Sequence, residues 1–366
     1  MASLLKDIYS LAFYERFSKI LAQHIPSFTK KEFLRLIFTK EFETMELKER
    51  MRHTSTVLHS FFPEDYAETT KLLEKIIASL RETGFGEDTL EFMILPDYIE
   101  TYGLAHYKHS VKALELVTQF VSCEFAVRPF LLQYGEQMMQ QMTTWSLHKN
   151  HKVRRLSTEG MRPKLPWAMA VPVLKKDPTP VLALLENLKN DPSEWVRRSV
   201  ANNLNDISKD HPAIVLEIAN RWKGIGKETD AIIKHGCRTL LKQGHAEILQ
   251  YYGLEGANIQ LTNFKVLTPK VKIGDALAFS FSICNNNTTA QVVRLEYAIY
   301  YRKANGQLSK KVFKISEKIY QPGEQAEIVR KQKFILITTR TFYAGAHEMS
   351  VIINGQEKIK GEFVLV

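Results

Sequence analysis

A segment of about 40 residues recurs in the middle of the chain, and this recurrence constrains the fold more than any other feature of the sequence. The stretch "HKVRRLSTEGMRPKLP" aligns with "SEWVRRSVANNLNDIS", which places Val153 on Val196 at an offset of 43 residues. A third stretch, "AIIKHGCRTLLKQG", places Ile233 on the same position at an offset of 37 residues. Such offsets are typical of stacked helical repeats, which bury one face against their neighbours and leave a concave surface for a partner.

The texture of the chain changes near residue 256. Before it, segments such as "KLLEKIIASLRE" carry apolar residues at three- and four-residue spacing, which predicts helices. After it, short β-rich runs such as "ALAFSFSI" and "VVRLEYAIYYRK" show alternating residue patterns, and turn sequences such as "ANGQ" and "QPGE" separate them. This pattern predicts strands. We therefore expect a multidomain α-then-β protein: an all-α HEAT-like helical repeat solenoid over residues 1–256, followed by an immunoglobulin-like antiparallel β-sandwich over residues 257–366.

Positive charge increases along the chain. The net charge of +10 divides into −4 over residues 1–148, +6 over residues 149–256 and +8 over residues 257–366. This gradient favours a polyanionic partner, although a solvated basic surface without a partner remains an alternative.

The three cysteines, Cys123, Cys237 and Cys284, lie far apart and form neither a CxxC pair nor a zinc spacing. We expect free thiols in a reducing, cytoplasmic setting and no bound metal. The sequence has no secretory signal pattern and no apolar run long enough to suggest a membrane span, so we expect no membrane association.

The repeat register predicts a polar stripe beside a buried one. If Val196, Val200 and Leu204 are buried, the residues two positions further along face outward at a spacing of four. The equivalent positions in the three copies are Arg155, Glu159 and Pro163; Arg198, Asn202 and Asp206; and His235, Thr239 and Gln243. The simplest alternative to a functional stripe is ion pairing on a solvated helix face, for which Arg155 and Glu159 have the right spacing.

Four motifs then indicate a family. "STEGMRPKLPWA", "SCEFAVRPFL", "EFMILPDYIETYG" and "WVRRSVANNLNDISKDHP" resemble the AlkC branch of the bacterial HEAT-like alkylpurine DNA glycosylases, and the resemblance covers essentially the whole chain. The tail also resembles the immunoglobulin-like extension found in part of that branch. The resemblance implies removal of cationic alkylated bases such as 3-methyladenine from double-stranded DNA without base flipping, with 3-methylcytosine and 1-methyladenine as further candidates. It also implies a bacterial, cytoplasmic and nucleoid-associated monomer that needs no cofactor.

Motif by motif, the resemblance assigns catalytic roles to four residues: Glu124, Glu159, Trp167 and Asp206. Alkylation makes the base a cationic leaving group, so bond breaking leaves an oxocarbenium-like sugar that carboxylates stabilise. A tryptophan can offer its π face to the cationic base. The basic residues set around these positions are expected to bind DNA: Arg155, Arg162, Lys164, Arg198, Lys234 and Arg238.

Each catalytic candidate also has a structural alternative. Glu124 could pair with Arg128 four residues on, Trp167 could fill a repeat junction, and Asp206 could cap the turn that follows it. Two other functions also stay open at this stage. The chain could be a non-catalytic repeat scaffold that binds DNA or protein, or its sandwich could bind carbohydrate or protein.

Overall fold

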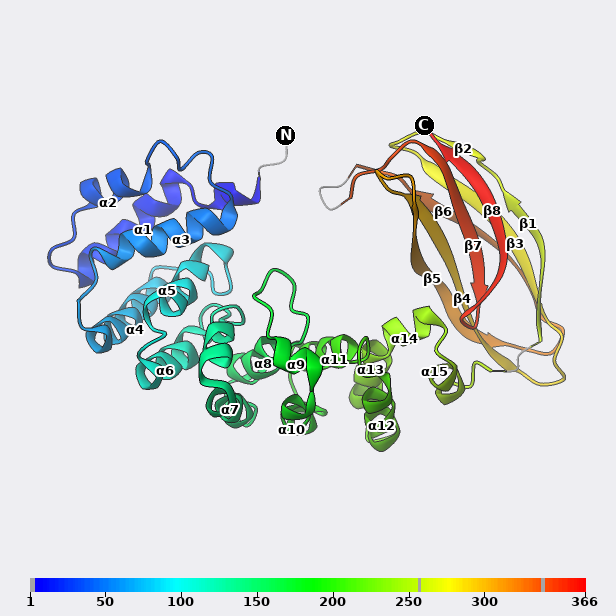
Figure 1. The fold of residues 1–366 in the computed structure, drawn as a ribbon, viewed down its shortest axis with the longest axis horizontal. Coiled ribbons are helices and arrows are strands. Elements are labelled where there is room, and N and C mark those ends of the chain that lie inside the picture. The colour runs from blue at the N-terminus through cyan, green and yellow to red at the C-terminus, as the bar shows by residue number, and fades with distance from the viewer. Residues whose placement is uncertain (1–3, 256–257, 337–339) are drawn as a thin grey trace. The chain divides into compact units, whose positions relative to one another are not determined.

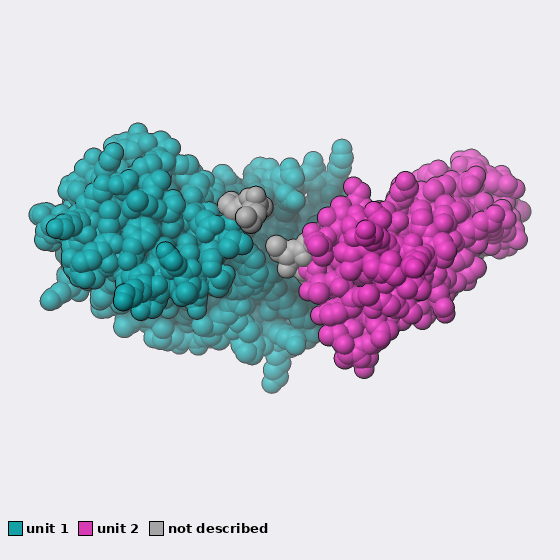
Figure 2. All heavy atoms as spheres, turned by 90° about the horizontal axis from the view of Figure 1, so that it is seen from above, with its two compact units in different colours: residues 1–236 teal, residues 237–366 magenta. Residues whose placement is uncertain are grey.

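The computed structural model describes residues 4–255, 258–336 and 340–366. The chain divides into two compact units, residues 1–236 and residues 237–366 (Figure 2). The expected domain boundary at residues 256 and 257 lies outside the described residues, and it stays a prediction. The change from helix to strand does fall in this region, between Tyr251 and Ile259.

The N-terminal half of the first unit consists of helices (Figure 1), and aromatic side chains pack against one another between them. Its elements are η1 (Leu5–Ile8), α1 (Leu11–His24), α2 (Lys30–Ile37), α3 (Leu47–His59), α4 (Tyr66–Glu82), η2 (Leu90–Met93), α5 (Ile94–Tyr102) and α6 (Tyr107–Val117). The Ser10 side chain caps α1 by accepting a hydrogen bond from the Phe13 amide, and Asp65 caps α4 in the same manner. Tyr14, Phe17 and Phe33 are fully buried.

The second half of this unit contains the repeats. Its helices are α7 (Val127–Trp145), α8 (His151–Gly160), α9 (Pro172–Lys176), α10 (Thr179–Leu188), α11 (Glu194–Ile207), α12 (Pro212–Trp222) and α13 (Lys227–Gly236). Helices α8, α11 and α13 pack in succession and form one row, while α7, α10 and α12 form the other (Figure 1). The predicted stripe of Val196, Val200 and Leu204 is buried as expected.

Two details of the repeat prediction are wrong. The third copy is not one helix, because α13 ends at Gly236 and a new helix, α14 (Arg238–Gln243), begins in the second unit. The polar stripe does not face solvent throughout, since Glu159 and Asp206 are only 6% and 1% exposed. Both carboxylates lie between α8 and α11, which bonds with Arg162 and Ser199 hold together.

The second unit is a two-sheet sandwich, and α14 and α15 (Ala246–Tyr251) belong to it. One sheet has the order β1 (Ile259–Val266), β3 (Ala276–Asn285) and β6 (Gln325–Lys333), and the other has the order β2 (Lys270–Val271), β8 (Gln356–Leu365), β7 (Gly345–Ile353), β4 (Gln291–Arg302) and β5 (Leu308–Tyr320). All pairings are antiparallel as predicted except for the short β2, which runs parallel to β8. Phe279, Leu295 and Val351 are among the buried side chains of the core between the sheets.

A close backbone contact ties the last two helices to this sandwich. Gly244, between α14 and α15, has a positive φ of 71°, and a Cβ built on it would lie 2.6 Å from the Gly355 carbonyl oxygen in the β7–β8 turn. Only glycine allows this approach, so the helices after residue 236 are anchored to the strands that follow them. None of the helices in the described parts of the chain has the length and apolar character needed to cross a bilayer.

Candidate active site

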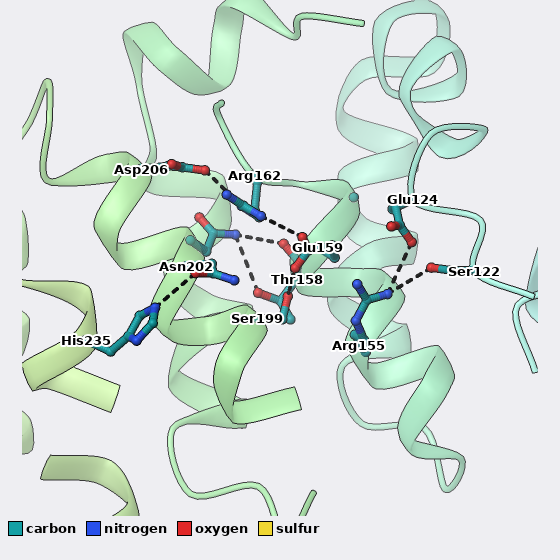
Figure 3. A network of polar contacts seen from close by, with 12 residues as sticks. Ser122, Glu124, Arg155, Thr158, Glu159, Arg162, Ser199, Asn202, Asp206 and His235 are labelled. Atoms are coloured by element: carbon teal, nitrogen blue, oxygen red, sulfur yellow. Dashed lines mark hydrogen bonds and ion pairs between the residues drawn. The ribbon is translucent and has the colours of Figure 1, made fainter. Parts of the chain in front are cut away.

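A buried ion network joins α8 to α11 at the loop that leaves α8 (Figure 3). Arg162 donates from Nη1 to Glu159 Oε1 at 2.6 Å and from Nε to Asp206 Oδ2 at 2.8 Å. The remaining oxygens of the two carboxylates are also bonded: Ser199 donates to Glu159 Oε2 at 2.5 Å and Lys209 to Asp206 Oδ1 at 2.8 Å. All four carboxylate oxygens therefore accept a hydrogen bond within the protein.

Arg162 carries its positive charge between these carboxylates although it is 8% exposed. Burial lowers the pKa of the guanidinium, but Glu159 and Asp206 outweigh burial and raise the pKa above its ordinary value. Removing one partner from such a buried pair leaves an uncompensated charge, which typically costs about 3–5 kcal/mol. The network is therefore a fixed electrostatic element between the two repeats.

A third carboxylate, Glu124, lies just before α7 and is half-buried. Its Oε2 accepts a hydrogen bond from Arg155 Nη1 at 3.2 Å, and the same nitrogen donates to Ser122 Oγ at 2.9 Å (Figure 3). The Arg155 guanidinium also lies 4.5 Å from the centroid of the Trp195 ring, in a cation–π contact. Arg155 thus holds Glu124 from one side.

Glu124 lines a cavity of about 320 Å³. The wall is mostly apolar and aromatic, and includes Tyr9, Phe125, Trp167 and Trp195. The fold therefore brings Glu124 and Trp167 together at one cavity, although 43 positions separate them in the chain. A flat, cationic group in this cavity would meet both a carboxylate and aromatic faces.

Trp167 is 67% exposed, so it does not fill a repeat junction. Its backbone has a φ of +64°, a left-handed conformation that non-glycine residues adopt rarely and at a cost of order 1–3 kcal/mol. Lys48 of α3 donates a hydrogen bond to the Trp167 carbonyl oxygen. Trp167 also borders a second cavity, of about 520 Å³, in which Glu100 and Asp97 flank Arg52.

The carboxylates also do not make the local contacts that were their structural alternatives. Glu124 bonds to Arg155 rather than to Arg128, and Glu159 bonds to Arg162 rather than to Arg155. The Asp206 carboxylate binds Arg162 and Lys209. Glu159–Arg162 and Asp206–Lys209 are local pairs three residues apart. The bonds of Arg155 to Glu124, Ser199 to Glu159 and Arg162 to Asp206 join segments far apart in the chain, which helix spacing alone does not predict.

The predicted DNA-binding residues fall into two groups. Arg155, Arg162 and Lys164 are already bonded to carboxylates, since Lys164 lies 2.7 Å from Asp210. Arg162 is buried and ion-paired with Glu159 and Asp206 within the protein, and its role in DNA binding stays a prediction. Arg155 is better described as a partner of Glu124.

The remaining three cations differ in exposure. Arg198 is exposed and lines a surface cavity of about 460 Å³ with Arg197, Lys227 and His235. Lys234 is half-buried on α13. Arg238 is half-buried as well, but it belongs to α14 and hence to the second unit. Phosphate binding by these residues stays a prediction.

Several residues of the site were not found from the sequence. Ser199 and Lys209 complete the network, Trp195 packs on Arg155, and Lys48 reaches the Trp167 loop from α3. Ser199 could have been identified, because it lies three residues after the buried Val196 and so on the side of α11 that faces α8. Lys48 gave no such signal, since it reaches the loop from 119 positions away in the chain. In the described part of the chain, no group of three or more His, Cys, Asp or Glu side chains could hold a metal ion.

Comparison with known proteins identifies relatives of the whole chain and of its C-terminal domain. Residues 260–366 match the family described as "Uncharacterised protein YhaZ, C-terminal Ig-like domain". The chain is 44% identical over 360 residues to the uncharacterized protein YhaZ of Bacillus subtilis (strain 168), covering 98% of both sequences. The solved structure of Pseudomonas fluorescens alkylpurine DNA glycosylase AlkC, bound to DNA containing an abasic site analog, matches with a TM-score of 0.92 at 33% identity and covers 100% of both chains.

Proposed function

The chain belongs to the AlkC branch of the HEAT-like alkylpurine DNA glycosylases, and we propose that it hydrolyses the N-glycosidic bond of cationic alkylated bases in double-stranded DNA. Substrates of this kind are 3-methyladenine and, as further candidates, 3-methylcytosine and 1-methyladenine. The observation that carries the proposal is the pairing of a half-buried carboxylate, Glu124, with Trp167 at one cavity beside the buried network.

Glu124 is the carboxylate best placed to meet the substrate. Its Oε2 is oriented by Arg155, and the side chain reaches the cavity that Trp167 borders. A carboxylate at this point stabilises the positive charge that develops on the sugar as the base leaves, and it can orient the attacking water. Because the alkylated base is already cationic, no acid is needed to protonate it.

Glu159 and Asp206 support the same step in a different way. Their oxygens are occupied by Arg162, Ser199 and Lys209, so they act through their charge and through the geometry they impose on the loop. Fixed charges of this kind need no reorganisation during the reaction, which is the main source of electrostatic catalysis. The exposed Trp167 offers its ring to the cationic base, a contact of about 0.5–2 kcal/mol.

This chemistry restricts the substrate range. An enzyme that leaves the damaged nucleotide stacked in the DNA duplex does not have to supply the few kcal/mol that unstacking costs. It can, however, cleave only N-glycosidic bonds that are already weak. Uncharged, bulky or oxidised bases should therefore stay bound to their sugars. The test is base release by the purified protein, resolved by product, from methylated duplex DNA and, separately, from duplexes that contain 8-oxoguanine or uracil. We expect 3-methyladenine and no 8-oxoguanine or uracil; release of the latter two would indicate a base-flipping enzyme, and no release at all would indicate a DNA-binding scaffold.

A further inference from the structure

Arg128, in the first turn of α7, is a fully buried cation that the proposed chemistry does not use. It is 1% exposed, and its guanidinium donates to three backbone carbonyl oxygens: Gly160 at 2.9 Å, Arg162 at 3.0 Å and Met169. Gly160 is the last residue of α8, Arg162 lies at the start of the loop that leaves this helix, and Met169 lies at the end of that loop. Arg128 therefore closes this loop through its backbone.

The position of Arg128 has a physical reason. Gly160 is the last residue of α8, and the carbonyls at a helix C-terminus lack intrahelical donors and carry partial negative charge. Helix α7 comes close enough to supply a donor because Gly160 has no side chain: a Cβ there would lie 2.5 Å from Val127 Cγ2. Burial, and then the nearby Arg162, lower the pKa of Arg128 to about 10 while Asp206 opposes them, so the guanidinium is charged at neutral pH.

Lys48 holds the same loop at its tip. Its ammonium group donates to the carbonyl oxygen of Trp167, the residue with the left-handed backbone. The loop is thus bonded at four carbonyls by two cations from α7 and α3. A strained residue persists only where surrounding contacts outweigh its cost, and these bonds are contacts of that kind.

We infer that Arg128 is a positioning residue that, together with Lys48, clamps the loop of residues 161–169 so that Trp167 projects beside Glu124 before DNA binds. The guanidinium fork is required, because its fixed donor directions reach three carbonyls that a single ammonium group cannot. The consequence for base excision rests on the proposed function, whereas the clamp itself does not.

The clamp can be tested without any activity. Trypsin does not cut before proline, so Arg162 is protected by Pro163 and the bond after Lys164 is the cleavable site within the loop. Cleavage there reports the opening of the loop. We expect Arg128→Lys and Arg128→Ala to be cut at Lys164 about tenfold faster or more, with a smaller increase for Lys48→Met.

The matched control is Arg154→Ala. Arg154 also binds two backbone carbonyls, and it pairs with Asp191, but it lies at the opposite end of α8. It should lower stability without exposing Lys164. Unchanged cleavage in both Arg128 variants, or equal cleavage in Arg154→Ala, would overturn the clamp.

Single-turnover base release then separates positioning from a general loss of structure. In Arg128→Ala we expect the rate to fall by about 10- to 100-fold while DNA affinity stays within about threefold, because a displaced group slows the chemical step more than binding. Free guanidinium ion, at concentrations far below those that denature proteins, should restore part of the rate and of the protection at Lys164. A rate that is unchanged per folded molecule would contradict the positioning role. If the unaltered protein releases no base, the proposed function fails, and the proteolysis result alone decides the clamp.

Discussion

The two carboxylate regions of the helical unit differ in burial and in how many of their carboxylate oxygens accept hydrogen bonds within the protein. Between α8 and α11, Glu159 and Asp206 are buried and every oxygen has a donor. At the neighbouring cavity, Glu124 is half-buried and is held at Oε2 by Arg155. The first region is built into the packing of two repeats, whereas the second presents a carboxylate to a cavity.

This difference separates two roles for carboxylates, whereas the family motifs assign Glu124, Glu159 and Asp206 a single catalytic role. A buried carboxylate with both oxygens hydrogen-bonded orders its surroundings and contributes a fixed electrostatic field. An accessible carboxylate can approach a substrate or a water molecule. Substitution in the first region should therefore cost both stability and activity, and substitution in the second should cost activity alone. The variants below test this distinction.

The largest effects are expected in the buried network. Glu159→Gln and Asp206→Asn remove one charge each and leave Arg162 incompletely neutralised. The free energy of unfolding should therefore fall by about 3–5 kcal/mol. Base release should fall by about 10²–10³-fold in the fraction that remains folded. Denaturant unfolding and single-turnover kinetics measure the two losses. Glu68→Gln, which breaks an exposed pair with Lys71, should change neither, and full stability in both network variants would show that the network is not the structural element described here.

How far the sequence could predict this site depends on the range of the contacts. The register of Val196, Val200 and Leu204 follows from helix periodicity, and the family motifs point to Glu124, Glu159, Trp167 and Asp206. The bond between Arg162 and Asp206 joins residues 44 positions apart in neighbouring repeats. Pairing of that kind depends on how closely two helices pack, which periodicity does not specify.

The same limit explains why helix spacing misjudges two orientations. Spacing offers an Arg155–Glu159 pair as the simplest alternative, but Arg155 bonds to Glu124, and Glu159 bonds to Arg162 three residues on and to Ser199 of α11. The polar stripe predicted to face solvent is buried at Asp206 because the loop after α8, with Arg162, covers it. The alternative that Trp167 fills a repeat junction also fails, because its side chain is largely exposed.

Trp167→Ala should have a smaller effect that is confined to function. Removing a cation–π contact of about 0.5–2 kcal/mol corresponds to a decrease in base release of roughly 3- to 30-fold. Stability should change little, because the side chain is largely exposed. Trp167→Phe keeps a ring and should retain part of the activity. A drop in stability comparable to that of Glu159→Gln would place Trp167 with the buried network after all.

Removing the second unit tests whether residues 1–236, which hold both carboxylate regions, bind DNA as well as the whole chain does. This fragment contains both carboxylate regions and should fold, because it forms a compact unit by itself. The segment from residue 257 onward carries +8 of the net charge, so the fragment should bind DNA about tenfold more weakly. The logarithm of affinity should also fall less steeply with the logarithm of salt concentration, by about 0.9 for each phosphate that the second unit would have neutralised. Equal slopes with and without the second unit would mean that its charge does not act on DNA.

Glu100, a further carboxylate at a cavity that Trp167 borders, should give the smallest effect, and one that depends on pH. Burial, and then the charge of Asp97, raise its pKa to about 7 from 4.5 in spite of Arg52. A raised pKa in the folded state means that Glu100 favours folding at low pH and that this contribution is lost as pH rises from about 4.5 through 7. Glu100→Gln should therefore stabilise the protein above neutral pH, by less than the roughly 3 kcal/mol that this shift would give without solvent screening, and gain nothing at low pH. Unfolding curves at several pH values measure this, and a gain that is the same at every pH would contradict it.

The central claim is that Glu124 is the carboxylate that meets the substrate, and Glu124→Gln tests it most directly. The amide keeps the shape and can still accept from Arg155, while the charge at the cavity is removed. Measured side by side with Glu159→Gln, it should lose base release by about 10²–10³-fold and keep the unfolding free energy of the unaltered protein within about 1 kcal/mol. Wild-type rates of 3-methyladenine release in Glu124→Gln, with the loss found only in Glu159→Gln, would contradict the account.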